Sequence, residues 1–196
     1  MDAPVSESTK NYWARKKEIA FKYDALSSTY EEVYWEEQLE KYRLVFANLQ
    51  NRSRGVCVEI GCGTGIGLGL GEKLFDRVWI GIDLSESMLK KARTRVLGGE
   101  QRHLVLADSD STPLRSNCAD LVVCVTLLSR ALDPMRTLEE LRRLVSPGGE
   151  IVVTVLKREF ARAELREMIS ESGLKIQRDV NTDQSVKDHV VFCSGI

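Results

Sequence analysis

Residues 56–65 read Val-Cys-Val-Glu-Ile-Gly-Cys-Gly-Thr-Gly, and this stretch decides the fold. Its first half is apolar or β-branched apart from Glu59, which predicts a strand buried on both faces. The three glycines that follow let the backbone turn with no Cβ in the way, so a ligand can lie against the main chain. We expect residues 66–74 to form a helix whose free amides point at that ligand.

The spacing of these glycines separates two classes of nucleotide ligand. Nicotinamide enzymes use Gly-x-Gly-x-x-Gly, in which the third glycine lets the helix pack closely on the strand. Counted from each glycine of the turn, that third position falls on Ile66, Leu68 or Leu70. The stretch therefore disfavours a dinucleotide cofactor, although a glycine turn alone is a weak signal.

Acidic residues follow the next two predicted strands. Residues 77–83 form an apolar run that ends in Asp83, whose two oxygens can accept hydrogen bonds from both hydroxyls of a ribose. Nicotinamide enzymes place an acidic residue there as well, so Asp83 does not discriminate between ligands. A third strand at 103–107 precedes Asp108 and Ser109, at the edge where parallel sheets bind ligands.

Strand and helix patterns alternate through the rest of the chain. Strands are expected at 119–126 and 150–156, and two more at 174–179 and 189–193 close the chain. This alternation predicts a doubly wound α/β fold with helices on both faces of a mostly parallel sheet. Residues 10–50 are helical in pattern, whereas 1–9 are expected to form a flexible tail before a single domain.

Five stretches, in the right order, resemble motifs of the class I S-adenosylmethionine-dependent methyltransferases, of the type 11 or type 25 kind. Residues 59–65 resemble motif I, residues 81–89 resemble motif II, and 119–126 resemble motif IV. The stretch 23–31 resembles the segment before motif I, and 146–149 resembles the turn before the fifth strand. The resemblance implies a Rossmann-like sheet of order 3-2-1-4-5-7-6 with strand 7 antiparallel, and a helical lid at 10–50 over a core at 54–196.

The resemblance also assigns residues to the cofactor, S-adenosylmethionine. It implies that Asp83 holds the ribose, that Leu84 and Met88 flank the adenine, and that Asp108 accepts from the adenine amino group. Met88 also fits plain core packing on its helix. The full set of implied cofactor-binding residues is Tyr30, Glu59, Gly61, Cys62, Gly63, Gly65, Asp83, Leu84, Met88, Asp108, Ser109 and Val125.

The same family needs few catalytic side chains, because the sulfonium methyl is already activated and alignment does most of the work. A base is required only if the acceptor is protonated. Thr126, Ser129 and Arg130 follow the fourth strand at the ligand edge, and His189 begins the last strand there, but we assign none a catalytic role. The chain lacks the Asn/Asp-Pro-Pro-Tyr motif of adenine-amine and glutamine-amide methyltransferases, and the Pro-Cys nucleophile of cytosine-C5 enzymes.

Composition sets broad limits on function. The chain has 196 residues and a net charge of −1, so no strong basic field points to nucleic acid. It lacks a long apolar run and a secretory signal pattern, from which we expect a cytoplasmic protein. Five cysteines without a Cys-x-x-Cys pair give no metal motif. The acceptor stays open between an RNA base, a protein and a small molecule. An NAD-dependent oxidoreductase and a non-catalytic cofactor-binding or regulatory domain are the alternatives.

The implied strand order places strand 103–107 at an edge of the sheet. Its interior, Leu104 to Leu106, has no proline and no charge, although exposed edges usually carry such residues to prevent pairing. We therefore expect this edge to be covered, either by the loop 112–117 or by a partner. Some RNA- and protein-modifying members of the family bind a small zinc-containing activator along this edge, so such an activator is a candidate partner.

Overall fold

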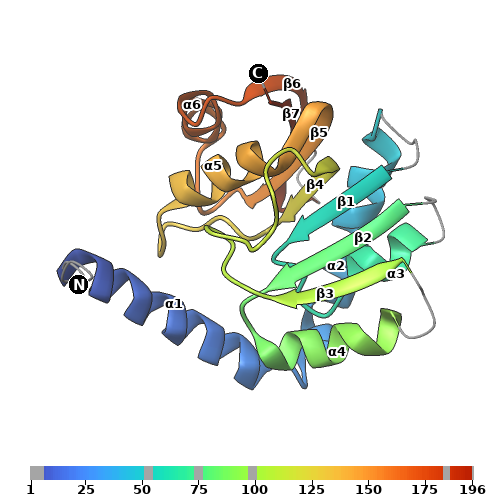
Figure 1. Cartoon of the computed structure of the whole chain (residues 1–196), viewed down its shortest axis with the longest axis vertical. Helices are drawn as coiled ribbons and strands as arrows, with labels where there is room; N and C mark the ends of the chain where they lie inside the picture. The colour runs from blue at the N-terminus through green and yellow to red at the C-terminus, as the bar shows by residue number, and fades with distance from the viewer. Residues whose placement is uncertain (1–6, 51–54, 73–76, 97–100, 183–185, 196) are drawn as a thin grey trace.

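A computed structural model describes residues 7–50, 55–72, 77–96, 101–182 and 186–195 of the chain (Figure 1). Its centre is a seven-stranded sheet of order β3-β2-β1-β4-β5-β7-β6. The first five strands run parallel, and β7 is antiparallel to both of its neighbours. This confirms the predicted strand order. The strands are β1 Gly55–Ile60, β2 Arg77–Asp83, β3 Arg102–Leu106, β4 Ala119–Val125, β5 Val145–Leu156, β6 Lys175–Val180 and β7 Asp188–Ser194.

Helices cover both faces of the sheet, as the alternating pattern predicts. They are α1 Glu7–Leu26, α2 Tyr30–Asn48, α3 Ile66–Glu72, α4 Glu86–Val96, α5 Pro134–Leu144 and α6 Arg162–Glu171. Side chains of α5 and α6 pack on one face, and those of α2 and α3 pack on the other. Successive residues of a strand point to opposite faces, so Val123 of β4 joins the second cluster while Cys124 joins the first.

Local capping signals determine where two helices begin. The Ser85 hydroxyl accepts from the Met88 amide at 3.1 Å at the start of α4. The Asp133 side chain accepts from the Met135 amide at 3.1 Å, and Pro134 occupies the first position of α5. Both caps satisfy amides that have no partner inside the helix.

Two boundaries differ from the predictions. Helix α1 begins at Glu7, inside the segment expected to be a tail, and residues 1–6 lie outside the described part of the chain. Residues 146–149, expected as a turn before the fifth strand, form a bulge inside β5. Ala119 of β4 pairs with Val145, and Leu121 pairs with Glu150. More residues of β5 than of β4 lie between these two pairs, and the excess forms the bulge.

Within the described residues, the helices are all too short or too polar to cross a membrane.

Candidate functional site

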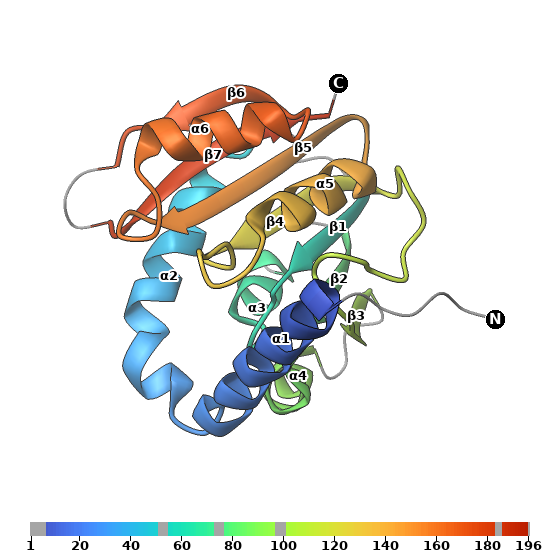
Figure 2. The same cartoon turned by 90° about the vertical axis from the view of Figure 1, so that its left-hand side faces the viewer.

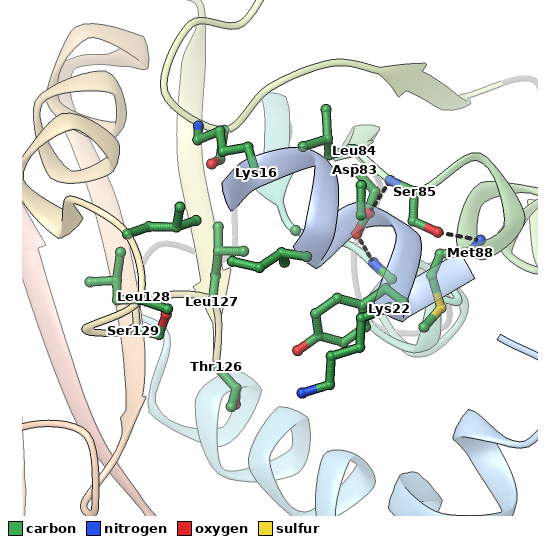
Figure 3. Close-up of a pocket in the computed structure, with 18 of the residues that line it drawn as sticks. Lys16, Lys22, Asp83, Leu84, Ser85, Met88, Thr126, Leu127, Leu128 and Ser129 are labelled. Atoms are coloured by element: carbon green, nitrogen blue, oxygen red, sulfur yellow. Dashed lines mark hydrogen bonds between the residues drawn. The ribbon is translucent and has the colours of Figure 1, made fainter. Parts of the chain in front are cut away.

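A pocket of about 360 Å³ opens at the carboxyl ends of β1, β2 and β4, beneath α1. In Figure 3, Asp83, Leu84 and Ser85 lie on one side of it, and Thr126 to Ser129 lie on the other. Parallel sheets bind ligands at this edge. The predicted cofactor-binding residues that line the pocket are Tyr30, Gly61, Gly63, Asp83, Leu84, Met88, Ser109 and Val125.

The glycine turn provides a backbone surface for a ligand. Gly61 and Gly63 have φ of 72° and 52°, in the left-handed region that disfavours side chains. A Cβ built on Gly63 has no heavy atom of the described residues within 4 Å, so this glycine faces open space in the pocket. A Cβ on Gly61 would stand 2.9 Å from the side chain of Leu127 instead. The turn is therefore open to a ligand mainly at Gly63.

Asp83 links the glycine turn to the next helix. Its Oδ2 accepts from the Gly63 amide and its Oδ1 from the Ser85 amide, each at 2.8 Å. Each carboxylate oxygen keeps a second lone pair, which leaves acceptors for two hydroxyl groups. Burial raises the pKa of Asp83, and the two amide hydrogen bonds oppose that shift. The geometry fits the ribose-binding role that the sequence predicts.

Glu59, Cys62 and Gly65 belong to the turn motif but are not among the residues that line the pocket. The buried Cys62 side chain faces β2, since a Cβ on Gly81 would stand 2.9 Å from its sulfur. Gly65 allows α3 to approach α4, because a Cβ there would lie 2.9 Å from the Cβ of Ala92. These residues shape the turn from behind, and their predicted contact with the cofactor stays a prediction.

Glu59 lies fully buried beneath the turn. Its carboxylate accepts from the Tyr42 hydroxyl and, at 3.1 Å, from the Trp79 indole nitrogen. Burial raises the pKa of Glu59 to about 7. The side chain thus connects α2, β1 and β2 and stays out of the pocket. Periodicity alone could not reveal this, because both partners lie on other elements.

Asp108 is also absent from the pocket lining, although its neighbours Ala107 and Ser109 are present. Its carboxylate Oδ1 accepts from the Asp110 amide at 3.0 Å and from the ammonium of Lys16, which comes from α1. Lys16 itself is 1% exposed and lines the pocket. The group that faces the pocket at this end is therefore a lysine, and the sequence analysis missed it.

Helix α1 is fixed across the pocket at two places. Its Asp24 accepts from the Ser85 hydroxyl at 2.6 Å and from the Ser87 amide at 3.0 Å, at the start of α4. Nearer its N-terminus, Lys16 binds Asp108 and Asp110. Figure 2 shows α1 in front of the ends of the central strands, beside α4. Tyr23 and Tyr30 also line the pocket, so the helical N-terminal region forms part of its wall.

Comparison with known proteins supplies a family for this arrangement. A family model described as a methyltransferase domain matches residues 58–153, which include the glycine turn, Asp83 and β4. The chain belongs to the class I S-adenosylmethionine-dependent methyltransferase superfamily. This confirms the resemblance seen in the sequence, and it disfavours the dehydrogenase alternative.

Individual relatives of this methyltransferase domain are distant. A malonyl-[acyl-carrier protein] O-methyltransferase of Marinomonas sp. is 32% identical over 142 residues, which cover 72% of this chain and 52% of that enzyme. The chain thus spans about half the length of this curated relative.

Solved structures are similar to this chain in fold. A chain from the complex between the Haloferax volcanii Trm112 methyltransferase activator and a methyltransferase superposes with a TM-score of 0.77 at 17% identity, covering 88% of this chain and 97% of that one. Magnesium protoporphyrin IX methyltransferase from Synechocystis, solved with bound S-adenosylmethionine, gives 0.79 at 15% identity and covers both chains fully. These two structures support the fold.

A buried polar cluster lies at the end of the pocket that is formed by residues 126–129. Thr126 has a φ of 56°, which is rare for a β-branched residue. Its hydroxyl donates to Asp188 at 2.8 Å and accepts from Lys41 at 3.0 Å. Lys41 also pairs with Asp188 at 2.9 Å and with Glu37 at 2.8 Å. These bonds hold the strained backbone at the end of β4, so Lys41 and Asp188 support the wall of the pocket from behind.

Sequence reasoning had pointed to other residues at this end. Thr126 and Ser129 do line the pocket, whereas Arg130 turns away to pair with Glu164 at 2.5 Å. His189 follows Asp188 in β7 and therefore points to the opposite face, where burial lowers its pKa. Side chains alternate along a strand, so only one of Asp188 and His189 can face Thr126. The acidic residue next to His189 was therefore the signal in the sequence that could have identified Asp188.

Proposed function

We propose that this chain transfers a methyl group from S-adenosylmethionine to an acceptor that binds beside residues 126–129. The observation that carries the proposal is the pairing of Asp83 with the open Gly63 turn. Asp83 would accept from the ribose hydroxyls, the Gly63 backbone would contact the amino-acid portion, and Leu84 with Met88 would flank the base. The bound cofactor supplies an electrophilic methyl group on a sulfonium, and the protein has to orient the acceptor toward it.

The acceptor end of the pocket favours a small molecule with apolar surface. Leu127, Leu132 and Leu156 line it, together with Ala131. The Marinomonas relative is named as an O-methyltransferase of malonyl-[acyl-carrier protein], so the group named for that enzyme is an acyl compound. We propose such a compound ahead of an RNA base or a protein side chain.

Transfer of a tritiated methyl group into fractionated lysate tests this proposal. We expect label in the small-molecule fraction that resists both protease and ribonuclease. The Asp83→Ala variant is the control and should give little label. If ribonuclease or protease removes the label, the methyl acceptor is RNA or protein, and the proposal of a small molecule is wrong. Cofactor binding without any labelled fraction would instead favour the regulatory-domain alternative.

We also propose that a small activator protein pairs with β3. This strand ends the sheet, and Leu106 is 55% exposed. The loop 112–117, which was one of the two candidates for covering the edge, is tied to α5, where the Thr112 amide donates to Glu140 at 2.8 Å. An open strand edge suits a partner that adds a strand. The fold neighbour from Haloferax was solved with such an activator, which supports the same kind of partner here.

Leu106→Asp tests the partner better than a change at Val105, because Val105 packs against the core. The variant should stay folded but lose a small subunit that co-purifies with the tagged wild type. Phe21→Asp is a matched control, since Phe21 is 75% exposed and belongs to α1 instead of β3. A wild-type chain that is monodisperse and active alone would contradict an obligatory partner.

We propose the cytoplasm as the compartment. All five cysteines are free, as is usual where thiols are kept reduced.

A further inference from the structure

Lys16 is buried, unlike an ordinary lysine on a surface helix. It belongs to the exposed helix α1, yet it is 1% exposed and lines the pocket at the end formed by Ala107 and Ser109. In Figure 3 its ammonium lies at the far end of the pocket from Thr126. Buried lysines are rare unless they are paired, and removing one from its partners is costly. A ligand at this end therefore meets the lysine itself.

The ammonium is held but not saturated. It binds the Asp108 carboxylate and, at 2.5 Å, that of Asp110. Asp110 is fixed in turn by hydrogen bonds from Tyr12 and, at 2.6 Å, from Thr137. An ammonium has three N–H donors, and among the described residues these two carboxylates are its hydrogen-bonding partners. The ring centroids of Tyr12 and Trp13 lie 5.2 and 5.9 Å from the ammonium nitrogen, and the third N–H is the donor that a ligand in the pocket would use.

We propose that Lys16 is a specificity residue for the cofactor, which donates a hydrogen bond to a ring nitrogen of the adenine base. This inference rests on the proposed function, which puts the base between Leu84, Met88 and the end of β3. Adenine has the ring acceptor N1 beside its amino group, so a fixed N–H donor matches it. Hypoxanthine carries an N1–H donor in that place, which would oppose the ammonium. Helix α1 thereby completes the base site.

The test measures binding, so it does not require the methyl acceptor. S-adenosylhomocysteine and its deaminated analogue S-inosylhomocysteine are titrated into the wild type by calorimetry. The wild type should prefer the adenine compound by about tenfold or more, because the wrong base leaves a charged donor unpaired. Lys16→Met should lower affinity for S-adenosylhomocysteine by about tenfold and should narrow that preference. Lys16→Arg, which keeps a hydrogen-bond donor, should retain most of the preference for the adenine compound.

Two control variants separate contact from support. Tyr12→Phe removes a hydrogen bond that anchors α1 to Asp110 but leaves the ammonium, so it should keep the base preference. Lys17→Met changes the exposed neighbouring lysine and should bind like the wild type. The inference is overturned if Lys16→Met binds as tightly as the wild type, binds more tightly, or keeps the full base preference. The inference is also overturned if Tyr12→Phe and Lys16→Met lose the base preference to the same extent. Failure of the wild type to bind S-adenosylhomocysteine would contradict the proposed function itself.

Discussion

Gly63 and Gly67 lie four residues apart and have opposite surroundings. A Cβ on Gly63 would enter the open pocket, whereas a Cβ on Gly67 would lie 2.4 Å from a carboxylate oxygen of Glu59 and 2.5 Å from the Tyr42 ring. The first glycine therefore serves the ligand, and the second serves packing beneath the turn.

Gly63→Val should consequently abolish cofactor binding while the chain stays folded. The strain of a side chain at positive φ should cost only about 1–2 kcal/mol of stability. Gly67→Val should instead lose about 3 kcal/mol or more, because the space is already filled. Urea denaturation beside calorimetry measures both effects. A folded Gly63→Val that binds normally would show that the turn does not face the cofactor.

Glu59 gives the protein a pH dependence with a definite sign. Burial raises its pKa to about 7 in the folded state, above its ordinary value of 4.5. The folded state therefore holds this proton more tightly than the unfolded state, so the stabilisation is complete below about pH 4.5 and is lost as the pH rises through 7.

The loss assigned to Glu59 amounts to about 3 kcal/mol across that interval. Glu59→Gln cannot titrate, so its free energy of unfolding should fall less between pH 5 and pH 8, roughly by that amount. Urea denaturation at several pH values provides the comparison. Parallel curves for the two proteins would mean that Glu59 ionises in the folded state as it does in solution.

At the scale of elements, α1 is attached by polar contacts at its two fixed points. Asp24 binds the start of α4, and Lys16 binds the loop after β3. A helix held mainly by a few hydrogen bonds opens more easily than one packed in the core. We propose that α1 acts as a lid over the cofactor, whereas α2 of the predicted lid 10–50 is anchored by core packing of Tyr42, Val45 and Phe46.

Hydrogen exchange tests the lid. Amides of α1 between Tyr12 and Asp24 should exchange more slowly when S-adenosylhomocysteine is bound, since the ligand adds contacts to Lys16 and Tyr23. Amides of β6, which forms the other edge of the sheet and has no residue in the pocket lining, should be unchanged and serve as the internal control. Equal protection of α1 with and without the ligand would argue against a lid.

The elements that sequence alone predicts well are those with local signals. Ser85 and Asp133 mark helix starts because a cap bonds to amides two or three residues away. The bulge in β5 could not be predicted in this way, because it depends on the register with β4, which no local pattern encodes.

At the scale of the whole molecule, the resemblance of five stretches to family motifs implied the strand order. The same motifs identified only part of the candidate site. The residues that were found, such as Asp83 and Met88, lie within motifs. Those that were missed depend on distant contacts: Lys16 meets Asp108 across 92 residues, and Lys41 meets Thr126 across 85. Charges on helices, such as Lys16 in α1 and Lys41 in α2, are usually part of a solvated face, so no sign in the sequence marked these two as buried. Only the assembled fold shows that Lys16, Lys41 and Asp188 are buried.

The identity of the nucleotide ligand is the central claim, and calorimetry tests it most directly. Purified protein is titrated with S-adenosylmethionine and, separately, with NAD. We predict saturable binding of S-adenosylmethionine that Asp83→Ala weakens by at least about tenfold, because charge-assisted hydrogen bonds to the ribose are lost. NAD should give no saturable heat. Binding of NAD without S-adenosylmethionine, or S-adenosylmethionine binding that Asp83→Ala leaves unchanged, would contradict the account.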